Sequence, residues 1–591
     1  MKQILALLLA MLMLTGCAGN TIAEVTSPEV TAETSAAAEV SFGGSMTAVE
    51  TAAPEYVSRF ESETIITLSD ESISVEGNEE SVYPSQDIIY YEDRDTYDSG
   101  NPYGEGEDHQ RHTAEEAAAH TVLNITAPGA YRISGKLSAG QIRVDLGDDA
   151  YFDPEAVVEL ILDDAEITCT VAPAILFLNT YECDGEWSTD NASPDVDTTA
   201  AGANLILEGQ NMVSGSHVAR IYKDKEGEKK LWKQDGAIYS YMSLNVYGPG
   251  SLDLTADNEG LDTELHLTIN GGDIAIRSDN DGINTNEDGV SVTTINGGRL
   301  HIIAGLGAEG DGIDSNGYLV INGGTVVASA NPAADAGLDS DLGSYINGGT
   351  VIALGSTMDW AESDSDQVTM NLQFADRQDG GSAIVVTRED GTVVFAYDPS
   401  EDEALGENVR QYMGAIISCP GFALEDTYSV YMGGILTGGE AGGVYTSVTA
   451  YEGGIQMQYS GTDLRGGMGR PGGVGQMPED MTLADGQRPA MPEGFEPGEM
   501  PQLPEGETIP ADFDPAQMGG RGQRPEGMTP PEGFEGELPT MPEGETFPDR
   551  QTPEGGFGSR GQTDSPTAGE PSTAFYMNDK VNAFSGVTAV I

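Results

Sequence analysis

Acidic and amide side chains recur in pairs along the middle of the sequence. The two members of each pair are separated by one residue and follow a Gly-Leu or Gly-Ile dipeptide; the pairs are Asp262 with Glu264, Asn284 with Asn286, Asp314 with Asn316, and Asp339 with Asp341. Oxygens of carboxylates and amides are the ligands that bind Ca²⁺, at distances of about 2.3–2.6 Å. The chemistry that these residues can support is therefore the binding of a hard divalent cation.

The pairs belong to a longer repeat. An Ile-Asn-Gly-Gly element contains Asn270, Asn296, Asn322 and Asn347, so that successive copies are 26, 26 and 25 residues apart. Periods of this length are typical of solenoids, and the intervening segments are short, rich in β-branched residues and bounded by Gly, as strands are. About 25 residues at roughly 3.3 Å each make a circuit of about 80 Å, enough for three short strands and three corners. The sequence therefore predicts an all-β fold built on a parallel β-helix, a solenoid with about 25 residues per coil.

Alternation along each strand predicts which side chains face outward. If Ile313 is buried, Ser315 points inward with it, whereas Asp314 and Asn316 point outward. Stacked coils are about 4.7–4.9 Å apart, so that equivalent carboxylates would repel each other by roughly 3–4 kcal/mol at an effective dielectric constant near 20. Two interpretations of this column stay open, a solvated acidic surface and a metal site. The asparagines of the Ile-Asn-Gly-Gly elements are expected to be structural, at corners where they hydrogen-bond along the stack.

The N-terminal region has the composition of a targeting segment and a tether. Residues 1–17 contain Lys2, an apolar run too short to span a bilayer, and the tetrapeptide Leu-Thr-Gly-Cys, which resembles a bacterial lipobox. They are predicted to be a lipoprotein signal peptide, with Cys17 as the lipidated residue. Residues 18–61 are rich in Ala, Thr, Ser and Glu and are predicted to be a disordered tether.

The remaining chain divides into an ordered domain and a low-complexity segment. Residues 62–360 are assigned to the β-helix, and residues 361–462 to a β-rich C-terminal part of the same domain that caps its open end. Residues 463–572 are rich in Gly, Pro, Met and Glu, with a recurring Pro-Glu-Gly motif and no periodic apolar face, and are predicted to be disordered. Residues 573–591 are predicted to regain order as a strand segment.

Charge restricts the partners of the protein. The formal net charge is −72, from 98 acidic and 26 basic residues. Nucleic acid is excluded as a partner because phosphate binding requires a basic surface. Between residues 235 and 360 the only cationic residues are Arg277 and Arg299. Neutral polysaccharides or cations are therefore easier partners than acidic polymers. Of the three cysteines after Cys17, Cys169 and Cys183 could pair, but the spacing does not decide it.

The repeats resemble bacterial carbohydrate-binding-domain lipoproteins whose right-handed β-helix is related to the pectate-lyase-like folds. The resemblance rests on Asp281-Gly-Ile-Asn-Thr, Asp311-Gly-Ile-Asp-Ser and the Ile-Asn-Gly-Gly series, and it covers roughly residues 62–460 and the C-terminus. It implies Ca²⁺ in the β-helix and binding of a plant-type polysaccharide such as cellulose or polygalacturonate. The candidate metal ligands are Asp262, Asp281, Asn284, Asp311, Asp314, Asn316, Asp339 and Asp341. The chain departs from the motif at Glu259 and Ala336, where other copies have Asp before the Gly, which weakens the expectation of sites there.

Three tyrosines are candidates for stacking on a sugar ring. Aligning residues 238–241 with residues 261–264 puts Tyr239 and Tyr241 in the outward columns, and the same alternation puts Tyr345 outward beside Asn347. Aromatic rings beside carboxylates and bound Ca²⁺ would offer stacking and polar capture for a glycan. The alternative is ordinary packing between tyrosines on a β surface.

The sequence thus predicts an exported, membrane-anchored lipoprotein that binds polysaccharide at the bacterial cell surface in a calcium-dependent manner. A polysaccharide lyase or glycoside hydrolase on the same fold is a second possibility. Its candidate bases, Arg277 and Arg299, fall at different positions of the coil and do not stack, and the many carboxylates single out no catalytic pair. His266 and His301 are expected to be strand residues rather than ligands. A structural adhesin that binds protein is the third possibility.

Overall fold

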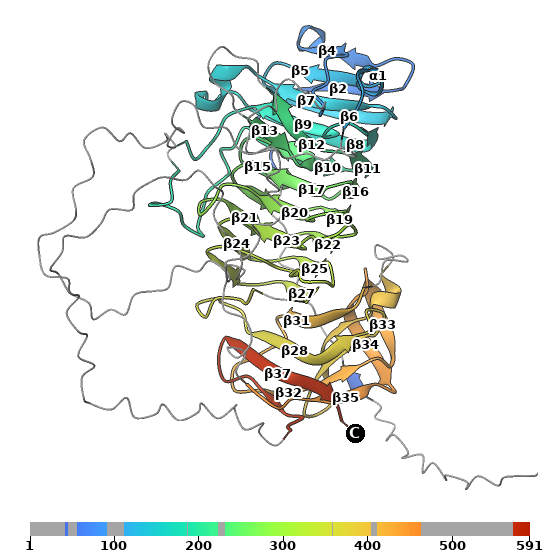
Figure 1. Cartoon of the computed structure of the whole chain (residues 1–591), viewed down its shortest axis with the longest axis vertical. Coiled ribbons are helices and arrows are strands. Elements are labelled where there is room, and N and C mark those ends of the chain that lie inside the picture. The colour runs from blue at the N-terminus through green and yellow to red at the C-terminus, as the bar shows by residue number, and fades with distance from the viewer. Residues whose placement is uncertain are drawn as a thin grey trace, which may run out of the picture. The chain divides into compact units, whose positions relative to one another are not determined.

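The computed structural model describes residues 42–44, 56–91, 111–185, 187–222, 231–356, 359–402, 410–462 and 571–590, and all of them belong to one compact unit. The predicted signal peptide with Cys17, most of the tether and nearly all of segment 463–572 lie outside the described residues. The described residues are almost entirely β-structure, which confirms the predicted all-β class (Figure 1). Their one α-helix is α1 (Ala114–Ala118), which begins at a capping box formed by Thr113 and Glu116. None of the described helices is long and apolar enough to cross a membrane.

One sheet has eight strands, and all but the first of them run parallel to their neighbours. In sheet order the strands are β4 (Val82–Ser85), β5 (Thr121–Ile125), β7 (Gly140–Asp145), β9 (Ile175–Asn179), β14 (Gly236–Ser240), β17 (Glu259–Thr263), β20 (Ile283–Thr285) and β23 (Ile313–Ser315). From β14 to β23 the register puts Ile238, Leu261, Ile283 and Ile313 in one buried column. The predicted alignment of residues 238–241 with residues 261–264 is therefore confirmed.

The larger sheet contains two further runs of parallel strands. The first run is β10 (Ala203–Glu208), β15 (Leu244–Tyr247), β18 (Leu267–Ile269), β21 (Val292–Ile295), β24 (Tyr318–Ile321) and β26 (Gly343–Ile346). The second run is β11 (Gln210–Gly215), β16 (Ser251–Ala256), β19 (Asp273–Ser278), β22 (Arg299–Ile303), β25 (Thr325–Ser329) and β27 (Thr350–Gly355). Both runs begin on the long strand β8 (Val158–Thr168), which itself follows β2 (Glu63–Leu68) and β6 (Gly129–Leu137). Consecutive strands such as β17, β18 and β19 thus lie in three different runs, and the next three strands repeat the pattern.

The asparagines of the Ile-Asn-Gly-Gly elements form a continuous ladder. The Nδ2 of Asn296, Asn322 and Asn347 donates to the Oδ1 of the preceding asparagine in the series, at 2.9, 2.9 and 3.0 Å respectively. The second Gly of the motif is required by the turn: Gly324 has φ +81°, and a Cβ there would lie 2.6 Å from the carbonyl oxygen of Gly298. The prediction that these asparagines are structural corner residues is confirmed.

The C-terminal part shares a hydrophobic core with the last strands of the second run. It comprises β28 (Thr369–Gln378), β29 (Ile384–Arg388), β30 (Val393–Tyr397), β31 (Tyr412–Ser418), β32 (Thr427–Met432), β33 (Ile435–Ala441), β34 (Val444–Glu452), β35 (Ile455–Gln458), β36 (Phe575–Tyr576) and β37 (Val581–Ala589). Strand β31 pairs antiparallel with both β27 and β28, and β37 pairs parallel with β28. β27, the last strand of the second run, is therefore covered by a hydrogen-bonded neighbour rather than left as an open edge.

A hairpin directly precedes β14 in the chain. Strands β12 (Val218–Tyr222) and β13 (Leu231–Gln234) pair antiparallel and form a separate two-stranded sheet. The next strand, β14, begins two residues after β13 ends, so the hairpin leads directly into the fifth strand of the eight-stranded sheet. Cys169, Cys183 and Cys419 are all free thiols, so the possible pair of Cys169 with Cys183 does not form.

Candidate functional site

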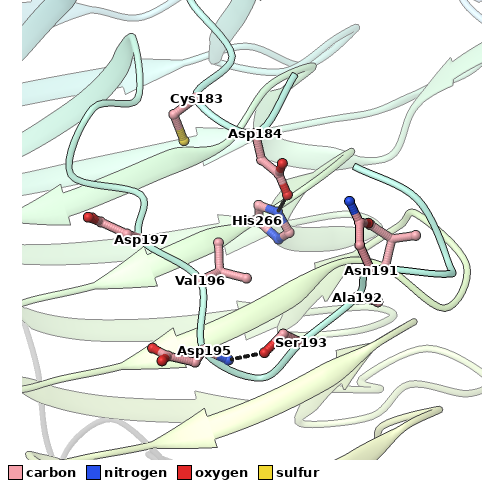
Figure 2. Close-up of a pocket in the computed structure, with 10 residues that line it drawn as sticks. Cys183, Asp184, Asn191, Ala192, Ser193, Asp195, Val196, Asp197 and His266 are labelled. Carbon is pink, nitrogen blue, oxygen red and sulfur yellow. Dashed lines mark hydrogen bonds and ion pairs between the residues drawn. The ribbon is translucent and has the colours of Figure 1, made fainter. Parts of the chain in front are cut away.

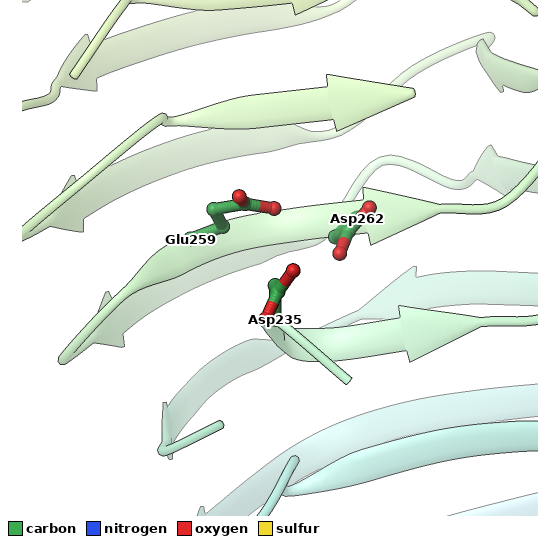
Figure 3. A group of neighbouring side chains, drawn as sticks. All are labelled: Asp235, Glu259 and Asp262. Atoms are coloured by element: carbon green, nitrogen blue, oxygen red, sulfur yellow. The ribbon is translucent and has the colours of Figure 1, made fainter. Parts of the chain in front are cut away.

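Three buried carboxylates meet at the start of β14 and β17 (Figure 3). Asp235 precedes β14, Glu259 is the first residue of β17, and Asp262 lies inside β17 opposite Tyr239. One carboxylate oxygen from each residue lies within 4.8 Å of the others, and the exposed fractions of the three residues are 6%, 4% and 0%. Oxygens at this spacing can converge on a single Ca²⁺, whose ligands lie about 2.3–2.6 Å from the ion.

Some oxygens of this group lack hydrogen-bond donors, although Asp262 Oδ1 accepts a hydrogen bond from Asn286 Nδ2 at 2.7 Å. Glu259 Oε2, Asp262 Oδ2 and Asn284 Oδ1 are buried and have no hydrogen-bond partner among the described residues. Asn284 lies on β20 in register with Asp262, so the three orphaned oxygens belong to neighbouring strands. A buried acceptor without a donor costs about 1–3 kcal/mol, and more when it is charged. The donor set, all hard oxygens, fits a calcium ion that would satisfy these atoms together.

The electrostatics of the three carboxylates also favour a bound cation. Burial, followed by the charge of Asp235, raises the pKa of Glu259 to about 8. Burial, followed by the charge of Glu259, raises the pKa of Asp262 well above its usual range. Lys233 Nζ lies 2.6 Å from Asp235 Oδ2, but the lysine side chain is 52% exposed. One partly solvated ammonium does not balance three carboxylates in a buried site, whereas a divalent cation would allow them to ionise.

Other predicted ligands extend the same column beyond this group. Asp314 lies on β23 in register with Asn284, and burial raises the pKa of Asp314 to about 7 and that of Asp311 to about 8. Asp281 Oδ1 accepts a hydrogen bond from the Asp311 amide at 2.6 Å. Asn316 Nδ2 donates to the Asn286 carbonyl at 2.9 Å. These residues are thus brought into a line, but no second group of three carboxylates as close as the first occurs within the described residues.

The solvated-surface interpretation is wrong for the centre of the column. Asp262, Asn284 and Asp281 have exposed fractions of only 0%, 7% and 9%. Towards the last coil the column opens, because Asp339 is half-buried and Asp341 is exposed. Alternation identified which side of the strand these residues occupy, but it could not show that other segments cover that side.

Two residues of the cluster, Asp235 and Glu259, were absent from the predicted ligand set. Both stand directly before the Gly of the repeat, the place that Asp281 and Asp311 occupy in later coils. Glu259 was interpreted as a departure from the motif, yet its longer side chain still brings a carboxylate to the cluster. The position before the Gly, regardless of whether it holds Asp or Glu, was the signal that would have identified them.

The prediction that Tyr239 offers an exposed ring is wrong. Its exposed fraction is 0%, its hydroxyl donates to Glu264, and its ring packs edge-to-face against Tyr241 with centroids 5.1 Å apart. Tyr241 is half-buried and accepts a hydrogen bond of 3.2 Å from Gln234 at the end of β13. The β12–β13 hairpin therefore takes part in covering this face. Tyr345 is half-buried next to Tyr318, with ring centroids 6.1 Å apart, and remains a candidate for stacking.

A small pocket lies beside the loop that follows β9 (Figure 2). His266 borders it and accepts a hydrogen bond at Nδ1 from the Val292 amide at 3.1 Å, so Nε2 carries the proton and donates to Asp184 at 3.3 Å. Burial lowers the pKa of His266, and the imidazole is accordingly neutral. The pocket holds about 260 Å³, slightly less than the roughly 300 Å³ at which ligand sites usually begin.

The chemistry of this pocket suits an uncharged group rather than an acidic one. Its wall includes the carboxylates of Asp184, Asp195 and Asp197, and no lysine or arginine is among the residues described there. Trp187, in the same turn as Asp184, donates from Nε1 to the Tyr151 hydroxyl at 3.2 Å, and the neighbouring Phe152 is largely exposed. The described parts of residues 182–202, which include this turn, contain no strand.

The two arginines of the repeats do not stack, as predicted. Arg277 lies opposite Ile303, whereas Arg299 lies opposite Asp273. Each arginine pairs with an aspartate on the preceding strand of its run. His301 is a strand residue of β22, as expected, and His266 directly precedes β18.

Comparison with known sequences finds a family model that matches much of the stacked strands. Residues 119–402 match the model of a family described as "Carbohydrate-binding domain-containing protein". A protein of Acetivibrio thermocellus with the same description is 29% identical over 157 residues, which are 26% of this chain and 45% of that relative. The chain thus spans less than half the length of this relative. A solved structure, described as the polysaccharide lyase-like protein from C. thermocellum in a gadolinium derivative, is 20% identical, with 49% of this chain and 93% of that chain covered and a TM-score of 0.28.

Proposed function

We propose that this protein binds polysaccharide at the bacterial cell surface and that its binding depends on calcium. The observation that carries the proposal is the buried group of Asp235, Glu259 and Asp262 with its orphaned oxygens, within a segment that matches a carbohydrate-binding family model. The chain passes through the three parallel runs in turn, by β17, β18 and β19 and again by β20, β21 and β22, which supports a parallel β-helix as the architecture. A right-handed sense agrees with the general preference of parallel crossovers within one sheet.

In this proposal Asp235, Glu259, Asp262 and Asn284 hold the ion. Calcium supplies positive charge to a buried, acidic site and joins neighbouring coils through their side chains. The chain's own residues fix the positions of these ligands. The strand register places Asp262 beside Asn284, and Lys233 forms an ion pair with Asp235. The metal thereby orders the coils on which a glycan rests.

The partner class follows from charge and from the family match. A net charge of −72 disfavours acidic polymers unless divalent ions bridge them, so the glycan is either neutral and cellulose-like or pectin-like and bridged by calcium. The Leu-Thr-Gly-Cys sequence ending at Cys17 supports export and a lipid anchor in the membrane. The protein would then display a binding surface on the cell.

A glycan array probed with the full protein tests this function. We expect binding to a neutral or uronate polysaccharide in excess Ca²⁺ and a loss of at least about tenfold in affinity in chelator. Asp262→Asn should reproduce the loss in the presence of Ca²⁺, whereas Asp163→Asn, at a partly exposed ion pair with Arg132, serves as the matched control. Equal binding with and without Ca²⁺ would contradict the calcium dependence. Release of unsaturated or reducing sugars from the bound glycan would show an enzyme instead, and binding to protein but no glycan would show an adhesin.

A further inference from the structure

A cleft lies between the second parallel run and the C-terminal part. Its floor is the outer face of β16, β19 and β22, and its opposite wall comes from Asp402, after β30, and from Glu440 and Gly442 at the β33–β34 turn. The cleft holds about 530 Å³, within the range of roughly 300–1,000 Å³ found for ligand sites, which often occur where two parts of a protein meet. It is separate from the carboxylates of β14 and β17.

Both cationic residues of the repeats line this one cleft. Arg277 and Arg299 are the only lysine or arginine residues between residues 235 and 360, and the register of β19 and β22 brings them to the same floor. Arg277 Nη1 donates to Asp253 Oδ1 at 2.8 Å, and Arg299 Nε donates to Asp273 Oδ1 at 2.8 Å. All four side chains remain 25–50% exposed, so each pair still presents donors and acceptors to the cleft.

A buried histidine completes the wall. His301 Nδ1 lies 3.2 Å from Asp402 Oδ2, and both side chains are at least nine-tenths buried. His301 Nε2 has no hydrogen-bond partner among the described residues. Gly442 makes this approach possible, because a Cβ there would lie 1.9 Å from His301 Cε1. The imidazole therefore forms part of the wall of the cleft, with Nε2 buried against Gly442 rather than presented to a ligand.

The charges of the cleft favour an uncharged ligand that is rich in hydroxyl groups. Four carboxylates, those of Asp253, Asp273, Asp402 and Glu440, face two guanidinium groups, so the cleft keeps an acidic balance. An acidic sugar would be repelled. A pyranose hydroxyl both donates and accepts, and it can bond to a carboxylate and a guanidinium at once. Strand neighbours about 4.8 Å apart present these groups repeatedly along the floor.

We propose that this cleft binds a neutral glycan segment, with Arg277–Asp253 and Arg299–Asp273 contacting its hydroxyl groups over the small side chain of Ala275. The inference rests on the proposed polysaccharide binding and names its site and ligand class. Calcium then acts at a distance, by ordering the coils, and is not a ligand of the sugar.

The test compares the binding of neutral and galacturonate hexasaccharides to the calcium-saturated full chain by calorimetry. The double variant Arg277→Gln/Arg299→Gln should bind the neutral sugar at least about tenfold more weakly, because both donor pairs are lost. Ala275→Trp should weaken binding equally by filling the cleft from its floor. Arg132→Gln is the matched control, since Arg132 forms ion pairs with Glu63, Asp163 and Glu208 on the same kind of strand surface outside the cleft.

The outcomes separate this inference from the proposed function. If the wild type binds glycan and both cleft variants bind it within about twofold of the wild type, the cleft inference is wrong and the polysaccharide-binding proposal stands. Preference of the wild type for the galacturonate would likewise overturn the neutral ligand. Binding of no glycan by the wild type would overturn the proposed function itself. If the double variant does not fold, Ala275→Trp decides alone, because it leaves both ion pairs in place.

Discussion

Aspartates occupy two faces of the stacked strands in opposite ways. On β17, Asp262 is fully buried and shares its surroundings with Glu259 and Asp235. On β16, Asp253 is half exposed and has an arginine at 2.8 Å. The strand type and the coil spacing are the same, so the difference arises from what covers each face and which counter-charge is present. The charge of a buried carboxylate group with too little positive charge must be relieved by protonation or by a bound cation, whereas a solvated ion pair is already satisfied and remains available to a ligand.

The largest expected effect is the pH dependence of folding stability in the metal-free protein, which should arise from the face that carries the buried carboxylates. The pKa of Glu259 and that of Asp311 are raised to about 8, mainly by burial, and that of Asp314 to about 7. The metal-free folded state therefore holds more protons than the unfolded state between about pH 4.5 and pH 8, and its stability falls as the pH rises through this window. We expect a loss of at least about 3 kcal/mol, allowing about 1.4 kcal/mol per pKa unit and only part of each shift.

Denaturant unfolding in chelator at about pH 5 and pH 8 measures this effect. With saturating Ca²⁺ the slope should reverse, because the ligands must be deprotonated to bind the ion. Stability that increases with pH in chelator would show that the carboxylates are ionised without metal, and the contrast between the faces would be lost. Asp253→Asn, at a half-exposed ion pair on the other face, is the matched control substitution.

The second effect concerns Tyr239, which helps to cover the face that carries the buried carboxylates. Tyr239→Ala should cost about 3–5 kcal/mol, the range for removing a buried aromatic ring, because it opens a cavity beside Asp262 and removes a donor from Glu264. The matched variant Tyr345→Ala, at a half-buried ring, should cost clearly less. Thermal unfolding of both variants provides the comparison. An equal, small cost for the two would mean that Tyr239 is exposed in solution.

A smaller effect is expected in the asparagine ladder, the uncharged column of the same stack. Asn296→Ala removes its donation to Asn270 and its acceptance from Asn322. The expected cost is about 1–3 kcal/mol, since two neighbouring amides each lose a partner. Denaturant unfolding should show this cost equally with and without Ca²⁺. A cost that appeared only in chelator would show that the ladder is coupled to the metal site. The asparagine ladder and the carboxylate column would then not be independent.

The smallest effect on stability should come from the face that carries the arginine–aspartate ion pairs. Arg299→Gln removes a partly exposed ion pair with Asp273, and such pairs contribute about 0–1 kcal/mol. The melting temperature should therefore change little, even though glycan binding is expected to weaken. A large loss of stability would show that Arg299 holds the C-terminal part in place and would remove it from the ligand-binding role.

The features that the sequence predicted well are those fixed by short-range spacing. The Asn ladder and its Gly at φ +81° follow from a motif of four residues, and the register of Ile238 with Leu261 follows from the repeat itself. The burial of Tyr239 could not be predicted, because the β12–β13 hairpin that helps to cover it lies outside the repeat pattern. The cleft was equally hidden, since His301 and Asp402 are 101 residues apart and meet only through the C-terminal part.

Calorimetric titration of Ca²⁺ into the metal-free full chain at neutral pH tests the central claim most directly. The account predicts saturable binding with release of protons, because Glu259 and Asp262 must ionise to bind the metal. It also predicts that Asp262→Asn weakens this binding by at least about tenfold and that Asp253→Asn does not. Absence of Ca²⁺ binding by the wild type, or an undiminished affinity in Asp262→Asn, would contradict the assignment of the buried carboxylates as a calcium site.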